Sequence, residues 1–308
     1  MKTFAPDYYT KFKCTADKCT HNCCIGWEID IDADSLEKYK NVSGEFGTCL
    51  RKNIDTTTDN AHFILSENDR CPFLNNKNLC TIITNLGEEN LCRICADHPR
   101  FRNFFSSSEE IGLGLCCEAA CELILSHKGD FKLVEIADDG NIEIDDEVDE
   151  CFFSKRQKLF KIVKDREHSM EERINKMLEM YDVTFPKKSV TDWKKIFFDL
   201  ERLDDAWDKK IENLGKFSHA VYNDEINNAF ENILIYFIYR HMPDGLYDGR
   251  MKERLCFVLL GFYVIGSIFR AEKDKTLNTL AEICRMYSAE IEYCEENIDK
   301  LLLVMNEQ

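Results

Sequence analysis

The sequence predicts a mainly α-helical protein, in which an irregular, cysteine-rich metal-binding region with a few short strands packs on a C-terminal helical bundle. Three observations predict this fold class. Most cysteines lie in the first 121 residues, apolar residues recur at helical spacing beyond about residue 151, and 44% of the chain is hydrophobic. We expect three regions, which are residues 1–126 for the cysteine-rich region, 127–150 for a short-stranded connecting segment and 151–308 for the bundle.

The distribution of the cysteines indicates the chemistry. Twelve of the 16 precede residue 122, and the other four are Cys151, Cys256, Cys284 and Cys294. The N-terminus shows no apolar leader segment, so we expect a cytoplasmic protein. Thiols stay reduced in that compartment, where an array of them indicates metal binding or catalysis rather than disulfides. The four later cysteines have apolar neighbours and are expected to be small core residues.

The charge of the chain limits its partners. It has 57 acidic and 40 basic residues and a net charge of -17. Such a surface repels phosphate backbones and anionic lipids, so we expect neither nucleic acid nor membrane as a general partner. It suits a partner that carries lysines. The longest apolar run, residues 256–269, is shorter than the roughly 20 residues of a membrane span and predicts a buried helix.

Local patterns predict the elements of the cysteine-rich region. Residues 1–30 are expected to be irregular, and Asp34 is expected to cap the helix that follows it. Residues 62–65 predict a strand. A polar turn followed by β-branched residues predicts a hairpin over residues 75–83. A short helix is expected to end before Pro99, because the residue before proline avoids helical backbone angles.

The rest of the chain is expected to be helical apart from the connecting segment. Glu118 to Leu125 predicts a helix, and the turn at Asp138–Asn141 predicts two short strands around it. Apolar spacing then predicts helices around residues 152–163, 174–178, 193–200, 226–238 and 255–269, and one continuous helix from Leu277 to Met305.

The cysteine spacings are typical of metal ligation. Thiolates are soft ligands that suit zinc and iron–sulfur clusters, and either centre needs about four of them. The spacing Cys92-x2-Cys95 lets two sulfurs approach one metal from a single turn. Only one such pair is present, whereas zinc fingers generally have two or add histidines. We therefore favour a [4Fe-4S] cluster, with zinc as the alternative.

Some thiols are adjacent in the chain, which limits how many can bind one metal. In a helix the side chains of Cys23 and Cys24, or of Cys116 and Cys117, diverge by about 100°. One member of each pair is then expected to be a ligand while the other packs, unless the backbone is irregular. The region offers more thiols than one site needs, so either two centres exist or some thiols only pack.

The order of the cysteine motifs resembles the flagellin lysine-N-methylase family. The motifs that carry the resemblance are Cys23-Cys24-Ile25-Gly26-Trp27, Cys71-Pro72-Phe73-Leu74, Leu79-Cys80-Thr81-Ile82, Leu86-Gly87-Glu88-Glu89-Asn90-Leu91-Cys92 and His98-Pro99-Arg100. They fall within residues 8–121, and the helical half also suits that family. Its N-terminal half is similar to small cysteine-cluster proteins thought to chelate zinc or iron.

With this resemblance, nine cysteines are candidate ligands. They are Cys14, Cys19, Cys23, Cys24, Cys71, Cys80, Cys92, Cys95 and Cys117. Relatives tend to have a Cys-Pro-Glu-Ala-like element where this chain has Cys117-Glu118-Ala119-Ala120. The missing proline leaves open whether Cys116 or Cys117 is the ligand.

The family implies transfer of a methyl group from S-adenosylmethionine to the ε-amine of lysines in flagellin or a similar protein. The sequence has no acidic-Gly-x-Gly-x-Gly loop of the Rossmann-like methyltransferases, since Gly112 and Gly114 stand alone. If S-adenosylmethionine is the donor, it must bind in an unfamiliar way, and our hypothesis is that its amino acid moiety binds the cluster iron. The competing class is a non-enzymatic iron–sulfur or zinc module that mediates protein interaction.

Methyl transfer to lysine requires a neutral amine, although free lysine has a pKa of about 10.4. Burial or a nearby base must remove the proton. Asp97, His98 and Arg100, beside Cys95, are the candidate catalytic residues. The alternative, which we favour for His98 and Arg100, is that they only order the loop around the cysteines.

Overall fold

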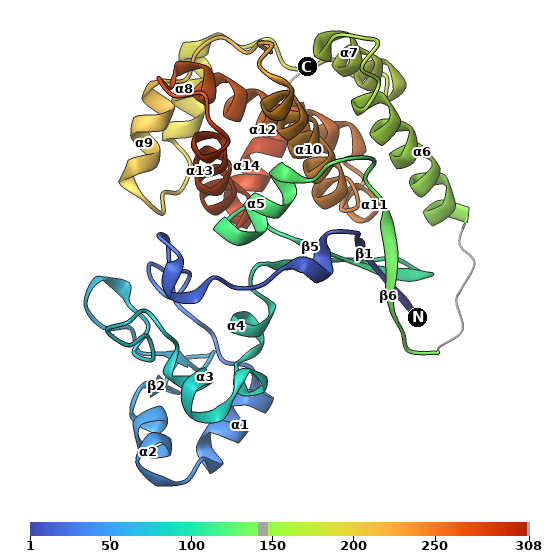
Figure 1. Ribbon diagram of the computed structural model, residues 1–308. Helices are drawn as coiled ribbons and strands as arrows, with labels where there is room; N and C mark the ends of the chain where they lie inside the picture. The colour runs from blue at the N-terminus through green and yellow to red at the C-terminus, as the bar shows by residue number, and fades with distance from the viewer. Residues whose placement is uncertain (141–146, 307–308) are drawn as a thin grey trace. The chain divides into compact units, whose positions relative to one another are not determined.

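The computed structural model describes residues 1–140 and 147–306 and confirms a mainly helical chain with a small sheet (Figure 1). The chain forms two compact units. The helical unit consists of Met1–Phe12 and Phe101–Gln308, and the cysteine unit consists of Lys13–Arg100. These bounds differ from the three predicted regions, because the N-terminal residues and those just after Arg100 pair in one sheet.

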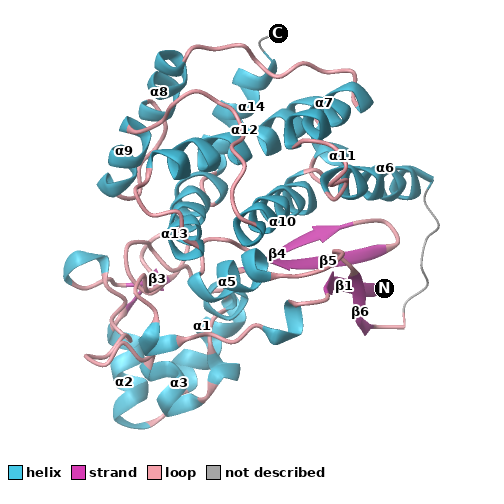
Figure 2. Cartoon of the chain, turned by 45° about the horizontal axis from the view of Figure 1, so that its top comes forward, coloured by secondary structure: helices cyan, strands magenta, loops and turns pink. Residues whose placement is uncertain are grey.

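That sheet belongs to the helical unit and has the strand order β4-β5-β1-β6 (Figure 2). The strands are β1 Lys2–Pro6, β4 Arg100–Phe104, β5 Ser108–Leu113 and β6 Leu133–Asp138. β1 pairs parallel to β5 and antiparallel to β6, with a register shift between Thr3 and Phe4. The prediction that residues 1–30 are irregular is therefore wrong for β1.

The predicted connecting segment is described only in part. β6 confirms the first of its two predicted strands. The second, after Asn141, lies outside the described residues.

The helices that follow the cysteine unit include the predicted ones and two more, α9 and α11. They are α5 Glu118–Ser126, α6 Glu147–Val163, α7 Met170–Met180, α8 Val190–Phe198, α9 Asp205–Glu212, α10 Asp224–His241, α11 Gly245–Asp248, α12 Met251–Ala271, α13 Leu277–Tyr287 and α14 Glu295–Asn306. Helix α9 was not predicted because it is short and mostly charged, although Trp207 and Ile211 on it are fully buried.

Helix α12 confirms the predicted buried helix at residues 256–269. In the part of the chain that the structure describes, α12 is the one helix long and apolar enough to cross a membrane, and 78% of that stretch is buried. It packs against α10, α13 and α14. Its apolar character is accounted for by this central position.

The predicted continuous helix from Leu277 to Met305 is wrong in its middle. A π-helical segment, Ser288–Glu292, separates α13 from α14. It brings two carboxylates into the interior. Glu290 accepts hydrogen bonds from the backbone N–H groups of Leu203 and Asp204, and Glu292 faces α10. The π-helical segment thus lies where the two carboxylates meet partners on different elements.

The cysteine unit is built from short elements. They are α1 Ala33–Asn41, α2 Gly44–Lys52, β2 Ile54–Asp55, β3 His62–Phe63, α3 Thr81–Leu86 and α4 Arg93–Asp97. β3 and α4 confirm a predicted strand and the predicted short helix before Pro99.

Two local predictions in this unit are wrong. The cap of α1 is Asp32, not Asp34, because the Asp32 carboxylate accepts a hydrogen bond from the Ser35 N–H. The predicted hairpin over residues 75–83 forms only its turn and a single bridge between Leu74 and Cys80. The β-branched residues that follow start α3 instead, and Ile82 is buried there.

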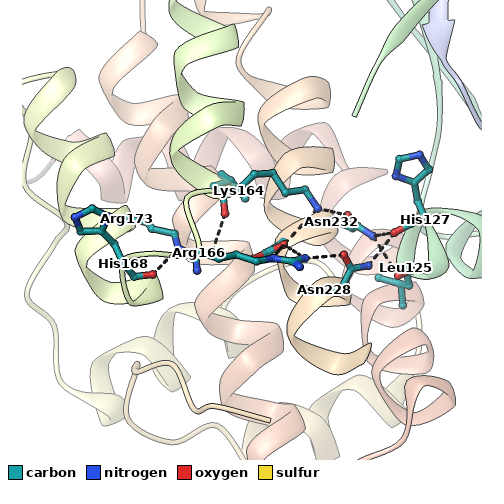
Figure 3. Close-up of polar contacts among 10 residues, drawn as sticks. Leu125, His127, Lys164, Arg166, His168, Arg173, Asn228 and Asn232 are labelled. Carbon is teal, nitrogen blue, oxygen red and sulfur yellow. Dashed lines mark hydrogen bonds and ion pairs between the residues drawn. The ribbon is translucent and has the colours of Figure 1, made fainter. Parts of the chain in front are cut away.

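A buried carboxylate ties three helices of the helical unit together. Glu231 on α10 accepts from Lys164 at 3.3 Å, Arg166 at 2.7 Å and Arg173 at 2.9 Å, and its side chain is 4% exposed. In Figure 3, Lys164 and Arg166 lie just after α6, and Arg173 lies in the first part of α7. Next along α10, Asn232 donates to the carbonyl of His127 just after α5. Burial raises the pKa of the Glu231 carboxyl, but the arginine hydrogen bonds outweigh it and lower that pKa overall.

We predict that Glu231→Gln lowers the free energy of unfolding by about 3–5 kcal/mol, because it leaves three cations around a neutral group. Chemical denaturation at pH 7 measures this, and Glu225→Gln, exposed on the same helix, should cost less than about 1 kcal/mol. The carboxylate contributes fully above its unfolded pKa of about 4.3 and loses its contribution as pH falls through the lower folded pKa. Wild type and Glu231→Gln should therefore converge in acid, and a difference that persists there would contradict the charge-based explanation.

Candidate functional site

Five of the predicted ligands gather in the cysteine unit. Cys71 and Cys92 are buried in its hydrophobic core, and Cys24, Cys80 and Cys95 are half-buried against the same core. They come from four separate stretches of chain, so the fold rather than a local motif brings them together.

Backbone pairing explains how distant thiols meet. The Cys71 N–H donates to the carbonyl of Cys24 at 2.8 Å, which joins the first cysteine motif to the second. The bridge between Leu74 and Cys80 then turns the chain back, so that Cys80 stands at the N-terminus of α3. Cys92 stands likewise at the N-terminus of α4, and Cys95 follows one turn later.

The pKa values of the thiols reflect this proximity. The hydrogen bond with Cys23, then burial, then the neighbouring thiols raise the pKa of Cys24, and Cys71 and Cys80 are among those neighbours. Burial, with Cys80 and Cys92 nearby, raises the pKa of Cys71 to about 11. Each sulfur is therefore within electrostatic range of several others.

In the predicted pair Cys92 and Cys95, the interaction between the two thiols lowers the pKa of Cys92 and raises the pKa of Cys95. Burial, Cys24 and Cys71 raise the Cys95 pKa further. The two residues lie one turn apart at the start of α4, and their role as a ligand pair stays a prediction.

The surroundings of the thiols are apolar. Ile29, Phe63, Phe73, Leu74 and Ile82 are buried in the same cluster. Such a shell excludes water and raises the cost of ionising a thiol unless a cation compensates it. The donor set and its shell suit a soft metal centre with thiolate ligands. Across residues 1–140 and 147–306, however, no group of three or more His, Cys, Asp or Glu side chains is already arranged to hold a metal ion.

The other predicted ligands are placed differently. Cys23 is exposed and pairs with Cys24, whose hydrogen bond lowers the Cys23 pKa to about 7. Cys14 is exposed and accepts from the Ala16 N–H, and the Cys19 thiol donates to the His21 carbonyl. Cys117 belongs to the helical unit, where it is the N-cap residue of α5. The role of these four as ligands stays a prediction.

Of the predicted catalytic residues, Asp97 is the last residue of α4, and His98 and Arg100 follow that helix. Arg100 donates to the Ala96 carbonyl at 2.9 Å and so binds the C-terminal end of the helix that carries Cys95. The His98 ring lies 6.0 Å from that of Trp27, and the Trp27 N–H donates to the Cys23 carbonyl. Burial, with a smaller contribution from Arg100, lowers the pKa of His98 to about 4.

The sequence analysis missed a buried polar cluster in the helical unit. Glu292 in the π-helical segment lies 2.5 Å from the His241 ring and accepts from the Tyr236 hydroxyl at 3.0 Å. Tyr236 in turn accepts from Arg240 and from the Leu115 N–H, just before Cys116 and Cys117. The one signal was a pair of glutamates within an otherwise core-facing apolar pattern. The cluster fixes the backbone that leads into α5.

Comparisons with known proteins identify the family. Residues 111–308 match the model of the FliB lysine N-methylase C-terminal domain. The chain is 26% identical to a lysine-N-methylase of Salmonella typhimurium over 142 residues, which are 42% of this chain and 34% of that protein. It is 28% identical to the flagellar biosynthetic protein FliU of Salmonella muenchen over 127 residues, 39% of this chain and 75% of that protein.

The chain thus covers about a third of the length of the lysine-N-methylase it matches. No solved structure matches. Because the family model covers more than half of the chain, including most of the helical unit, the chain belongs to the FliB lysine N-methylase family.

Proposed function

We propose that the chain is a cytoplasmic protein lysine N-methyltransferase that transfers a methyl group from S-adenosylmethionine to lysines of flagellin or a similar protein. Membership of the lysine N-methylase family is the observation that carries this proposal. The reaction breaks the bond between the sulfonium sulfur and the methyl carbon, and it forms a bond from that carbon to the ε-nitrogen. The amine must first lose its proton.

We propose further that the cysteine unit holds a [4Fe-4S] cluster, with zinc as the alternative. The residues that would hold it are among Cys24, Cys71, Cys80, Cys92 and Cys95, which share one apolar core. When bound, such a cluster supplies a metal to which the amino acid moiety of S-adenosylmethionine can bind.

The loop after α4 orders this region rather than serving as a strong base. With a pKa of about 4, His98 is neutral at pH 7 but is a far weaker base than a free lysine amine. Transfer of a lysine proton to it would be uphill by about six pKa units, or roughly 8 kcal/mol. Arg100 already binds the end of α4. Burial of the acceptor lysine, which lowers its pKa, is then the more effective way to neutralise it.

The net charge of -17 supports a lysine-bearing acceptor. An acidic surface attracts cationic protein segments and raises their rate of encounter, an effect that salt screens. The charge does not identify the acceptor, so flagellin is proposed from the family that the cysteine motifs resemble, and the flagellar name of one relative supports it.

We predict that anaerobically purified full-length protein contains iron and acid-labile sulfide, about four of each per chain. Cys24→Ser and Cys95→Ser should each lower metal affinity by more than about tenfold, since losing a ligand costs at least as much as losing a residue that orients one. Cys49→Ser, a change at an exposed thiol on α2 outside the group, should have no effect. Zinc without sulfide would overturn the [4Fe-4S] assignment.

We also predict that the iron-loaded protein transfers labelled methyl groups from S-adenosylmethionine to flagellin lysines, as detected by peptide mass spectrometry. The rate should rise about tenfold per pH unit until the pH reaches the pKa of the bound lysine, because only the neutral amine reacts. An iron-containing protein that neither binds the donor nor labels the acceptor would favour a non-enzymatic binding module.

A further inference from the structure

Helix α1 contacts the segment that carries the Cys92–Cys95 pair at two points. At the first, the Asp32 carboxylate accepts from the Ser35 N–H at 3.0 Å and from the Arg93 N–H at 2.8 Å. One carboxylate thus caps two helices, its own α1 and the distant α4. The residue in the N-cap position of α4 is Cys92, whose side chain makes no capping hydrogen bond.

The start of α4 depends on Asp32 rather than on its own N-cap side chain. An N-cap side chain normally accepts from the second or third N–H of its helix, and the Cys92 side chain makes no such hydrogen bond. The Asp32 carboxylate accepts from the first, the Arg93 N–H. It therefore ties the residue next to Cys92 to α1, and the Cys92 thiol interacts with that of Cys95 one turn further along α4.

The second point of contact lies on the other side of Cys92. The Tyr39 hydroxyl donates to the carbonyl of Asn90 at 2.8 Å. Tyr39 is 1% exposed, and its ring stacks on Phe63 at 6.1 Å, so the hydroxyl is rigidly placed. Together the two contacts hold the backbone two residues before Cys92 and one residue after it.

We infer that Asp32 and Tyr39 are positioning residues, which hold the Cys92–Cys95 pair in the conformation that presents both sulfurs to one partner. This inference rests on the proposed function for the identity of that partner, a soft metal centre. The placement of the thiols themselves is a property of the chain and can be tested without metal. Orientation of ligands by surrounding hydrogen bonds is a general requirement of metal sites.

The test uses the alkylation of thiols in the reduced, metal-free full-length protein. Iodoacetamide labelling followed by peptide mass spectrometry gives the rate at each cysteine, with exposed Cys49 as the internal reference. Cys92 is 0% exposed, so its alkylation reports local opening. Asp32→Ser keeps a good cap for α1 but has one side-chain oxygen where aspartate has two.

We expect Asp32→Ser to raise the alkylation rate of Cys92 by about tenfold, as for the loss of one charge-assisted hydrogen bond. Tyr39→Phe, which keeps the ring on Phe63, should raise it about fivefold. Asp34→Ser removes the same charge from an exposed position in the first turn of α1 and should leave the rate unchanged. Thermal unfolding of Asp32→Ser should be only slightly lower than that of Asp34→Ser, by an amount that corresponds to the one lost hydrogen bond.

Wild-type rates at Cys92 in both Asp32→Ser and Tyr39→Phe would overturn the inference, and Asp32 would then be a cap of α1 alone. Iron and zinc analysis of the same variants separates this result from the proposed function. If the wild-type protein binds no metal, the proposed metal centre is wrong, while the positioning of the two thiols by Asp32 and Tyr39 still stands. Metal-binding wild type with lowered affinity in Asp32→Ser, and not in Asp34→Ser, is the result we expect.

Discussion

Thiolates repel one another, and this repulsion determines what the cysteine unit can do. Five sulfurs share one apolar core, where interactions with neighbouring thiols and burial raise the pKa values of Cys24, Cys71 and Cys95. In a medium of low dielectric constant the second thiolate of such a group is far more costly than the first. In the proposed centre a bound metal cation would remove that cost, and the thiols would lose their protons as they became ligands.

Part of this arrangement follows from local sequence and part does not. The spacing of Cys92 and Cys95 predicted two sulfurs that can approach one metal, which stays a prediction, and the short helix before Pro99 was confirmed. The approach of Cys71 to Cys24 depends on backbone pairing between segments almost 50 residues apart in the chain. Spacing cannot show such a contact, which is why nine candidates could not be reduced further from the sequence.

The helices were predicted more completely than the charges inside them. Apolar periodicity identifies a buried face, and α10 and α12 show it along most of their length. A charged residue on such a face is predicted to be exposed, because the sequence does not show its partner. The partners of Glu231 are Arg166 and Arg173, which lie about 60 positions earlier in the chain. The partner of Glu292 is His241, about 50 positions earlier. The break between α13 and α14 was not predicted for the same reason, because the partners of its two carboxylates are far away in the sequence.

The family match and the thiol geometry support different parts of the proposed function. The matched residues 111–308 lie in the helical unit and include only Cys117 of the nine candidate ligands. The match thus supports lysine methylation without bearing on the metal. The metal proposal depends on the cysteine unit, where Asp32 caps the thiol-bearing helix from outside its own sequence. If the site required only that four thiols lie near each other, the hydrogen bond from α4 to Asp32, the cap of α1, would be unnecessary. By accepting from the Arg93 N–H, Asp32 fixes the start of the helix that carries both thiols, and a ligand pair requires orientation of this kind.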